Sequence, residues 1–518
     1  MGKFELTFSV SDRYFYLRTL SGLDALPVDV WEAVDLHTLR TSNLKAAAAF
    51  RPHADETCER VFNRAFNKAY EAPRLPQLSF LDPHQREGVE WILTRARSYL
   101  AHAPGAGKTA QAVVASCLIK APGQTVFVVP PSLTENWERE IWAFTREFKA
   151  FPTVGIVQTT ANRHATAWRA DFVIVPDSML ATPWVYDRLH KMRIKLLAVD
   201  EASRFKESTS TRSLAFYGGK SKYRFYPGLF QNARHVVLLD GSPMPNGRGM
   251  ELWAPTFALD PEAIDCMSQR DYGLKFCGPT MNNRGQYEFK HLSNELELRR
   301  RLRQRFMHVV TEDQLSHPER RRSILFMNKD VRTPDIKNWE RKNLNKLKLE
   351  ELSEETSQGE IATIRKELGL LKVPWIARYI QDRIQMKAES ILLFVWHRDV
   401  AIALRNQIAY SALVIGGTPA AEREKTFEQF QSGKLKVIVG NIAAMGRGHN
   451  LQRADRVVFG EPSWSDELNT QCEKRASRRG RDAEAFVRCE YVVCPGSMDE
   501  RVMKTLFTKQ MRTKRVMG

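Results

Sequence analysis

Paired cysteines are absent from this sequence. Its 7 cysteines form no CxxC pair and are scattered along the chain, at Cys58, Cys117, Cys266, Cys277, Cys472, Cys489 and Cys494. An odd, scattered set of this kind does not predict a disulfide framework or a zinc module. It is typical of a protein in a reducing compartment.

Long apolar runs and targeting segments are lacking as well. No run approaches the roughly 18 apolar residues that a membrane-spanning helix needs. The N-terminal stretch MGKFELTFSVSDRYFYL has neither the apolar core nor the cleavage site of a signal peptide. We therefore expect a soluble protein with no membrane partner, cytoplasmic in a bacterium or a virus-infected cell, or nuclear in a eukaryote. No zinc-ligand, acetyl-lysine-reading or other long accessory segment predicts a reader of histones.

Acidic residues are in deficit. The chain carries 78 Lys and Arg against 60 Asp and Glu, which gives a formal net charge of +18, and 43% of its residues are apolar. In an otherwise globular composition this excess predicts a polyanionic partner, with a generally basic soluble protein as the alternative. A chain of 518 residues exceeds what one core usually organises, so we expect two or three domains.

Residues 101–109 (AHAPGAGKT) have the composition of a loop that binds a polyphosphate. Gly105 and Gly107 let backbone N–H groups turn inward, Lys108 adds a point charge, and the Thr109 hydroxyl can ligate a metal ion. The strict pattern GxxxxGK[ST] fails at its first position, so an ordinary loop is the alternative. Context favours the phosphate loop, because a short apolar run precedes it and helical spacing of apolar residues follows it.

Further motifs follow strands with near-continuous apolar character, at residues 125–130, 171–175, 194–199 and 235–239. Such strands, separated by helical stretches, indicate a parallel sheet covered on both faces, with functional groups at the strands' carboxyl ends. Asp200 and Glu201 stand at one of these ends. They predict a magnesium ligand that complements Thr109 and a carboxylate that orients or deprotonates the attacking water.

A second α/β pattern begins at residue 390 and has no phosphate loop of its own. It carries AMGRGHNL at 444–451 and QCEKRASRRGR at 471–481. Arg475 and Arg478 are three residues apart, so on a helix they share a face and can reach one anion together. A basic helix end is the alternative. An arginine brought to a γ-phosphate from a second lobe couples hydrolysis to closure of the lobes.

The remaining segments complete the predicted organisation. Residues 4–19 alternate as a β-hairpin around Ser11-Asp12, followed by mixed helical sequence to about Ala72. Residues 331–386 are polar and helix-prone and predict helical protrusions, or alternatively a solvated charged helix. The predicted divisions are an N-terminal accessory domain at 1–74, an ATP-binding lobe at 75–260, a helical bridge at 261–386, a second lobe at 387–500 and a basic C-terminal helix or tail at 501–518.

Together these segments resemble the Swi/Snf family of superfamily-two helicase-like ATPases, over roughly residues 75 to 500. The motifs that carry the resemblance, in the family's order, are LDPHQREGVEWIL, AHAPGAGKT, VFVVPPSLTENWEREI, LLAVDEASRFK, VVLLDGSPMPN with ELWAPTFALDP, AMGRGHNL and QCEKRASRRGR. The passages SQRDYGLKFCGP and IRKELGLLKVPWIARYIQD before ILLFVWHRD are most similar to the annealing-helicase (HARP-like) branch. The resemblance implies two tandem RecA-like lobes with helical protrusions and a small N-terminal α+β extension, typical of a compact bacterial or viral member.

The resemblance also implies roles for individual residues. Gln85 would read adenine, and the loop residues Ala103, Pro104, Gly105, Ala106, Gly107, Lys108, Thr109 and Ala110 would hold ATP and Mg²⁺. Lys108, Asp200, Glu201, Arg475 and Arg478 would be catalytic, with Thr109 and Asp200 at the metal and Gln471 at the nucleotide. Ser132, Asn136, Ser242, His397, Gly417 and Asn450 lie in motifs that face the DNA track in such enzymes.

This sequence departs from the family at several of these motifs. DEAS replaces DEAH, so Ser203 must make any contact that the histidine would make. HAP at 102–104 replaces an acidic stretch, DGSP stands for TGTP, and Arg481 replaces a glutamine. These changes leave nucleotide binding intact and put the efficiency of coupling to DNA in question.

The resemblance implies an ATP-driven translocase that moves on double-stranded or branched DNA as a monomer and remodels or reanneals it without reading bases. The basic stretches at 299–322, 474–481 and 504–515 would contact phosphates. Three alternatives remain: an RNA-dependent helicase, a nucleotide-switched DNA-binding scaffold with slow hydrolysis, and a chromatin remodeller.

Overall fold

The fold is described from a computed structural model of the 518-residue chain. The described residues are 4–9, 15–19, 32–35, 38–41, 47, 78–158, 166–222, 224–266, 268–282, 285–315, 320–344, 359–445, 451–477 and 486–517. The chain forms two compact units. The first comprises residues 1–244, 248–310 and 516–518, and the second comprises residues 245–247 and 311–515. Each unit is described by itself.

The N-terminal residues form a small antiparallel sheet. Strand β1 (Phe4–Phe8) pairs with β2 (Phe15–Thr19), which confirms the predicted hairpin; the predicted turn at Ser11-Asp12 lies outside the described residues. Strands β3 (Glu32–Asp35) and β4 (Thr38–Thr41) complete the order β1-β2-β4-β3. The prediction of helical sequence is therefore wrong at β3 and β4. β4 pairs with β2 and β3 pairs with β4, and the threonines at both ends of β4 favour extended backbone.

The first unit is built on a seven-stranded sheet in the order β15-β5-β12-β9-β6-β8-β7. Every neighbouring pair in it is parallel. The strands are β5 (Arg97–His102), β6 (Gln124–Val129), β7 (Val154–Ile156), β8 (Phe172–Pro176), β9 (Ile194–Asp200), β12 (Ala233–Asp240) and β15 (Met307–Val310).

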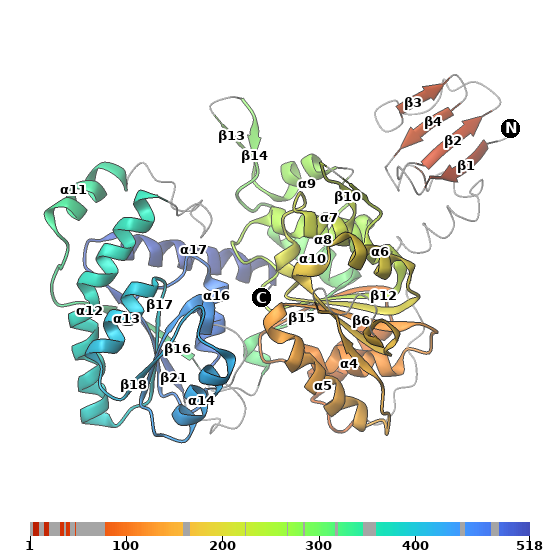
Figure 1. The fold of residues 1–518 in the computed structure, drawn as a ribbon. Helices are drawn as coiled ribbons and strands as arrows, with labels where there is room; N and C mark the ends of the chain where they lie inside the picture. The colour runs from red at the N-terminus through yellow and green to blue at the C-terminus, as the bar shows by residue number, and fades with distance from the viewer. Residues whose placement is uncertain are drawn as a thin grey trace. The chain divides into compact units, whose positions relative to one another are not determined.

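Helices cover both faces of this sheet, as Figure 1 shows. Alternate residues of one strand therefore enter two different cores: Phe127 and Val129 of β6 pack in one, and Val126 and Val128 in the other. This explains why the strands read as continuous apolar runs. The helices of this unit are α3 (Pro83–Leu93), α4 (Lys108–Leu118), α5 (Thr134–Arg146), α6 (Pro183–Lys191), α7 (Thr211–Tyr217), α8 (Trp253–Leu259), α9 (Gln269–Phe276) and α10 (Glu295–Arg305).

Two short ribbons complete the first unit. Strands β10 (Gly219–Lys220) and β11 (Phe225–Tyr226) form one, and β13 (Thr280–Met281) and β14 (Tyr287–Glu288) form the other.

The second unit repeats the architecture with a six-stranded parallel sheet in the order β16-β21-β20-β17-β19-β18. Its strands are β16 (Arg320–Phe326), β17 (Ile391–Val395), β18 (Ser411–Val414), β19 (Val437–Asn441), β20 (Arg456–Phe459) and β21 (Val487–Val493). Its helices are α11 (Pro334–Asn343), α12 (Glu360–Lys387), α13 (Arg398–Gln407), α14 (Ala420–Gln431), α15 (Ile442–Met445), α16 (Asp466–Glu473) and α17 (Met498–Met517).

The predicted fold class of two α/β lobes with parallel sheets is confirmed. Two of the strands inside the stretch predicted to be a bridge join the large sheets: β15 joins that of the first unit and β16 joins that of the second. None of the helices in the described residues is long and apolar enough to cross a membrane.

Candidate nucleotide and nucleic-acid site

The phosphate loop stands where the sequence predicts, between the end of β5 and the start of α4. Gly105 and Gly107 both have positive φ, +92° and +73°, which L side chains rarely adopt. The loop can therefore turn at both positions without strain. Because α4 starts immediately after Gly107, its first backbone N–H groups face the loop, the arrangement that binds phosphate at helix N-termini.

The carbonyl oxygen of Ala106 holds the loop in place. It accepts hydrogen bonds from the side-chain amides of Gln85 (3.2 Å) and Gln111 (3.1 Å), and His84 Nε2 lies 3.0 Å from it. The Gln85 Oε1 atom accepts in turn from the backbone N–H of Asp82, at 3.0 Å, which caps α3. In this arrangement Gln85 supports the loop; its role in reading adenine stays a prediction.

Two histidines connect the loop to the strand β15. His102 Nε2 lies 2.7 Å from His308 Nδ1, and both strands pair in parallel register with Val310 opposite His102. Burial and the charges of His308, Lys108 and His84 hold the pKa of His102 well below its usual value. Burial also lowers the pKa of His308. Both imidazoles are therefore neutral at pH 7, and one donates its N–H to the other.

Lys108 donates from Nζ to the His102 carbonyl oxygen at 2.8 Å. The ammonium thus lies over the loop that the sequence assigns to phosphates. Thr109 follows on the first turn of α4, as predicted for a metal ligand at a helix start.

The acidic pair lies at the carboxyl end of β9. Asp200 Oδ2 accepts from Trp137 Nε1 at 2.9 Å, and its Oδ1 accepts from the backbone N–H of Glu201 at 3.0 Å. Burial raises the pKa of Asp200, and the Trp137 hydrogen bond and the Lys108 charge oppose that shift. Glu201 has a φ of +52°, a backbone conformation that costs a side-chain-bearing residue about 1–3 kcal/mol and often occurs at functional sites.

A third acid, missed by the sequence reasoning as a site residue, connects two motifs. The buried Asp240, at the end of β12, accepts from the backbone N–H of Ser203 at 2.5 Å and of Ser242 at 2.6 Å. Burial and the nearby charge of Glu201 raise the pKa of Asp240 to about 6. The serine of DEAS therefore contacts Asp240 through its main-chain N–H and also through its side chain. The sequence contains a pattern that could have identified Asp240, since it ends an apolar strand just as Asp200 does.

The residues present fit a magnesium ion. Thr109 and Asp200 offer oxygen atoms, the donor type that Mg²⁺ prefers, and Mg²⁺ usually takes only one or two carboxylates besides phosphate and water. Each Asp200 oxygen accepts one hydrogen bond and keeps further lone pairs for a metal ion or its waters. The parallel register brings Asp200 beside β12 and Asp240 beside Ala101 at the start of the loop.

The residues predicted to face DNA are distributed over both units. In the first, Ser132 is exposed just after β6, Asn136 follows on α5, and Ser242 follows β12. All three come after strands whose carboxyl ends share the edge with the phosphate loop.

In the second unit, His397 caps α13 and its Nδ1 lies 2.7 Å from Oε1 of the buried Glu461, so it is held by that carboxylate. Gly417 is exposed with a φ of +93°, and an added Cβ there would meet no atom within 4 Å. Its backbone is therefore open to a ligand. Asn450 lies outside the described residues.

The arginine motif differs from its predicted helical geometry. Helix α16 ends at Glu473, so Arg475 lies in the turn beyond it, where its carbonyl accepts from the Leu451 N–H at 2.9 Å. Gln471 is on the helix, and its amide donates to Glu467 at 3.0 Å. Arg478 lies outside the described residues, so its predicted face shared with Arg475 is untested. At Arg475 itself the predicted helical backbone is wrong, because α16 ends at Glu473.

Several arginines and one lysine of the predicted phosphate-contacting stretches are engaged within their own units. Arg301 pairs with Glu297 at 2.7 Å and Arg305 with Asp260 at 2.8 Å. Arg320 pairs with Glu312 and Glu473. Arg322 pairs with Asp466 and Glu473, and Lys474 pairs with Glu312. These ion pairs hold the five side chains within their own units, and their contacts with DNA phosphates stay a prediction. Lys504, on α17, is exposed, and its phosphate contact stays a prediction.

The loop geometry predicts a specific cost for Gly107→Ala. An added Cβ would lie 2.1 Å from Gln85 Nε2, in addition to the strain of the positive φ. We expect a loss of more than the ~1–2 kcal/mol of the conformational strain alone, because the Gln85 amide must move away and give up its hydrogen bond to the Ala106 carbonyl oxygen, together with weaker ATP binding. Calorimetric melting and ATP titration measure the two effects. Gly285→Ala is the control, because its φ of +70° is similar but no atom lies within 4 Å; equal losses in both variants would contradict the prediction.

The histidine pair predicts a pH effect. Because the pKa of His102 is lowered on folding, its contribution to stability is complete above about pH 6.5 and declines below it, by at most about 1.4 kcal/mol per pH unit. In His102→Gln this slope should disappear. Melting temperatures at pH 7.5, 6.5 and 5.5 compare the variant with the wild type, which cancels the opposite effects of Asp200 and Asp240. His291→Gln is the control, and parallel profiles for wild type and His102→Gln would contradict the prediction.

Comparison with known proteins identifies the family to which the chain belongs. The model of the SNF2-related domain matches residues 84–368, and that of the helicase conserved C-terminal domain matches residues 372–481. The chain is 26% identical over 439 residues to the DNA annealing helicase and endonuclease ZRANB3 of Bos taurus, covering 80% of this chain and 38% of that protein. It is 25% identical over 430 residues to the SWI/SNF-related matrix-associated actin-dependent regulator of chromatin subfamily A-like protein 1 of Bos taurus, covering 82% of this chain and 43% of that protein.

The chain thus spans about two fifths of the length of these curated relatives. A solved SWI2/SNF2 ATPase core of Sulfolobus solfataricus in complex with dsDNA shares 18% identity and a TM-score of 0.39, covering 88% of this chain and 94% of that one. The similarity to annealing helicases predicted from the central stretch is confirmed. Since the SNF2-related model alone matches more than half of the 518 residues, the chain belongs to the SNF2-related family.

Proposed function

We propose that this protein is an ATP-driven translocase on double-stranded DNA, which remodels or reanneals DNA without reading base sequence. The observation that carries the proposal is the convergence of a phosphate loop, Lys108 and the pair Asp200-Glu201 at one edge of one parallel sheet, in a chain of the SNF2-related family. The proposal that the substrate is DNA is supported by the name of a relative, since ZRANB3 is named a DNA annealing helicase.

The residues divide the chemistry of ATP hydrolysis between them. The N–H groups at the start of α4 and the Lys108 ammonium would bind the β- and γ-phosphates. Thr109 and Asp200 would hold Mg²⁺, which neutralises phosphate charge when bound. Glu201, fixed in its left-handed conformation next to Asp200, would orient the attacking water and take its proton.

The second unit would supply the groups that respond to the γ-phosphate. Gln471, Arg475 and Arg478 are assigned this role, and a guanidinium there stabilises the charge that develops in the transition state. Ser132, Asn136, Ser242, His397, Gly417 and Asn450 would follow the DNA backbone. Contacts of this kind position a duplex and carry no sequence information.

The test is steady-state ATP hydrolysis at fixed low salt, without nucleic acid and then with duplex DNA, forked DNA, single-stranded DNA and RNA. Strong stimulation by duplex or forked DNA supports the proposal, and a preference for forked DNA supports annealing or remodelling of branched DNA. Stimulation by RNA alone would identify an RNA-dependent helicase. No stimulation by any of them would favour a nucleotide-switched scaffold.

Substitutions in the loop and at the acid should separate binding from hydrolysis. Lys108→Ala removes a phosphate contact and should weaken ATP binding. Glu201→Gln keeps the size of the side chain but not its basicity, so ATP should bind normally while turnover falls at least about a hundredfold. Binding of a fluorescent ATP analogue and single-turnover hydrolysis measure the two steps. Normal turnover in Glu201→Gln would remove Glu201 from the mechanism.

A further inference from the structure

The chain leaves the first unit through a strand that contacts the phosphate loop. The carbonyl oxygen of Val310, the last residue of β15, accepts from the N–H of Ala103 at 2.8 Å. Val310 is also the last residue of the first unit, and Thr311 begins the stretch that belongs to the second. Only Thr311 therefore lies between this loop contact and Glu312.

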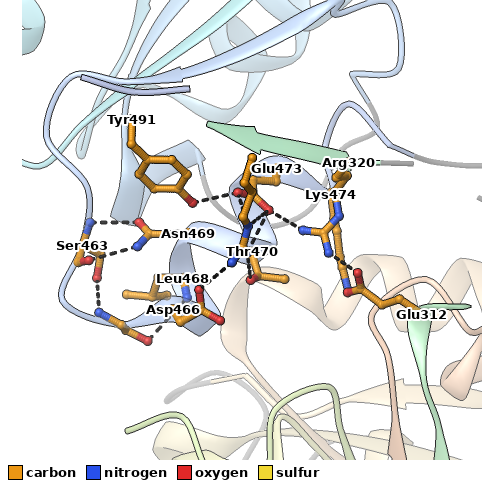
Figure 2. A network of polar contacts seen from close by, with 12 residues as sticks. Glu312, Arg320, Ser463, Asp466, Leu468, Asn469, Thr470, Glu473, Lys474 and Tyr491 are labelled. Atoms are coloured by element: carbon orange, nitrogen blue, oxygen red, sulfur yellow. Dashed lines mark hydrogen bonds and ion pairs between the residues drawn. The ribbon is translucent and has the colours of Figure 1, made fainter. Parts of the chain in front are cut away.

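Glu312 pairs with two cations of the second unit. Its carboxylate forms ion pairs with Arg320, on the edge strand β16, and with Lys474, the residue directly after α16, as Figure 2 shows. Although burial raises it, the charges of Arg320 and Lys474 lower the pKa of Glu312 to about 2. The carboxylate is therefore charged across the working pH range.

Glu473 lies at the centre of the same network. Its side chain is fully buried, and it accepts from Arg320, from Arg322 Nε at 2.8 Å and from the Tyr491 hydroxyl at 2.7 Å. Arg322 also reaches Asp466 at 3.0 Å and Thr470 at 2.6 Å, along the length of α16. A buried carboxylate with this many charge-assisted hydrogen bonds has one favourable position, so the end of α16 is fixed.

The opposite end of α16 is fixed as well. Asn469 and Ser463 exchange hydrogen bonds of 2.9 Å, and Ser465 caps the helix by accepting from the Leu468 N–H. Because both ends of α16 are held, a displacement of Glu312, Arg320 or Arg322 would be transmitted to the helix. The turn that begins at Lys474 and contains Arg475 follows directly from this fixed end.

From these contacts we propose that Glu312, Arg320, Arg322, Glu473 and Lys474, the connector clamp, position the arginine-bearing turn in response to nucleotide. The path runs from the phosphate loop to Val310, two residues along the chain to Glu312, and through Lys474 and Glu473 to Arg475. These five are positioning residues, since none of them is assigned a contact with ATP. The inference rests on the proposed function and deepens it, because it names what couples the two units.

A merely structural network would give a different result. Loss of a structural ion pair lowers stability and reduces all functions together. Loss of a positioning contact lowers the turnover number while ATP still binds, because the loop and its phosphate contacts are unchanged. Glu312 is informative for a second reason: removing an acid cannot weaken binding to DNA phosphates, whereas removing Lys474 could.

The test is a double-mutant cycle with Glu312→Gln and Lys474→Met. We expect each variant to lower kcat at saturating ATP and duplex DNA by about tenfold, in the usual range of couplings between sites. KM for ATP should stay within about twofold. The double variant should be no slower than either single one, because both substitutions break one link. Lys474→Arg, which keeps the charge, should restore most of the rate.

Lys337→Met is the matched control, because Lys337 forms a 2.9 Å ion pair with Asp330 in the same unit and outside the clamp. It should leave kcat unchanged. A normal kcat in Glu312→Gln, multiplicative losses in the double variant, or a fall in kcat that only follows a fall in melting temperature would overturn the inference.

A wild-type chain that hydrolyses ATP without responding to any DNA would overturn the proposed function, and the same cycle on the basal rate would still decide on the clamp. Hydrogen exchange of the peptide 466–477 gives a readout that needs no hydrolysis. Adding a non-hydrolysable ATP analogue should change its protection in the wild type and not in Glu312→Gln. Equal changes in both proteins would overturn the inference.

Discussion

The parallel register around β5 is the constraint on which the candidate site depends. β5 lies between β15 and β12, so the loop that follows it is flanked by Val310 on one side and Asp240 on the other. β9 pairs with β12, which adds Asp200 and Glu201 to the same edge. Because the carboxyl ends of parallel strands lie at the same edge of a sheet, formation of the sheet brings these groups together. A register slip of one residue in one strand would turn the side chains of that strand to the opposite face of the sheet.

Two kinds of hydrogen bond then fix the groups at that edge. Backbone N–H groups of Ser203 and Ser242 converge on Asp240, which joins the loop after β9 to the loop after β12. Side-chain amides converge on the Ala106 carbonyl, which orients the phosphate loop before any ligand arrives. A preorganised site of this kind loses less conformational freedom on binding. In the motifs DEAS and DGSP this connection depends on the main-chain N–H groups of both serines and on the side chain of Ser203.

Much of this arrangement was predictable from the sequence, because it depends on local patterns. Continuous apolar runs predicted the strands of the parallel sheet, and the glycines together with Lys108 predicted the phosphate loop. Trp137 and His308 could not be assigned in this way, since their roles at Asp200 and His102 exist only after residues far apart in sequence are packed together. β3 and β4 were missed because four-residue strands take their stability from pairing with β2 and with each other. The end of α16 was missed because Arg475 continues a helical spacing that its backbone does not follow.

The basic stretch at 299–322 shows that net charge predicts a polyanionic partner better than it predicts which side chains contact that partner. From sequence alone its arginines look available to a polyanion, yet Arg301, Arg305, Arg320 and Arg322 all have acidic partners in their own unit. Internal pairing redistributes charge and cannot change its sum. With 78 basic and 60 acidic side chains, the excess of 78 − 60 = 18 positive charges persists however the acids are distributed. The electrostatic argument for a polyanionic partner therefore holds whichever side chains make the phosphate contacts.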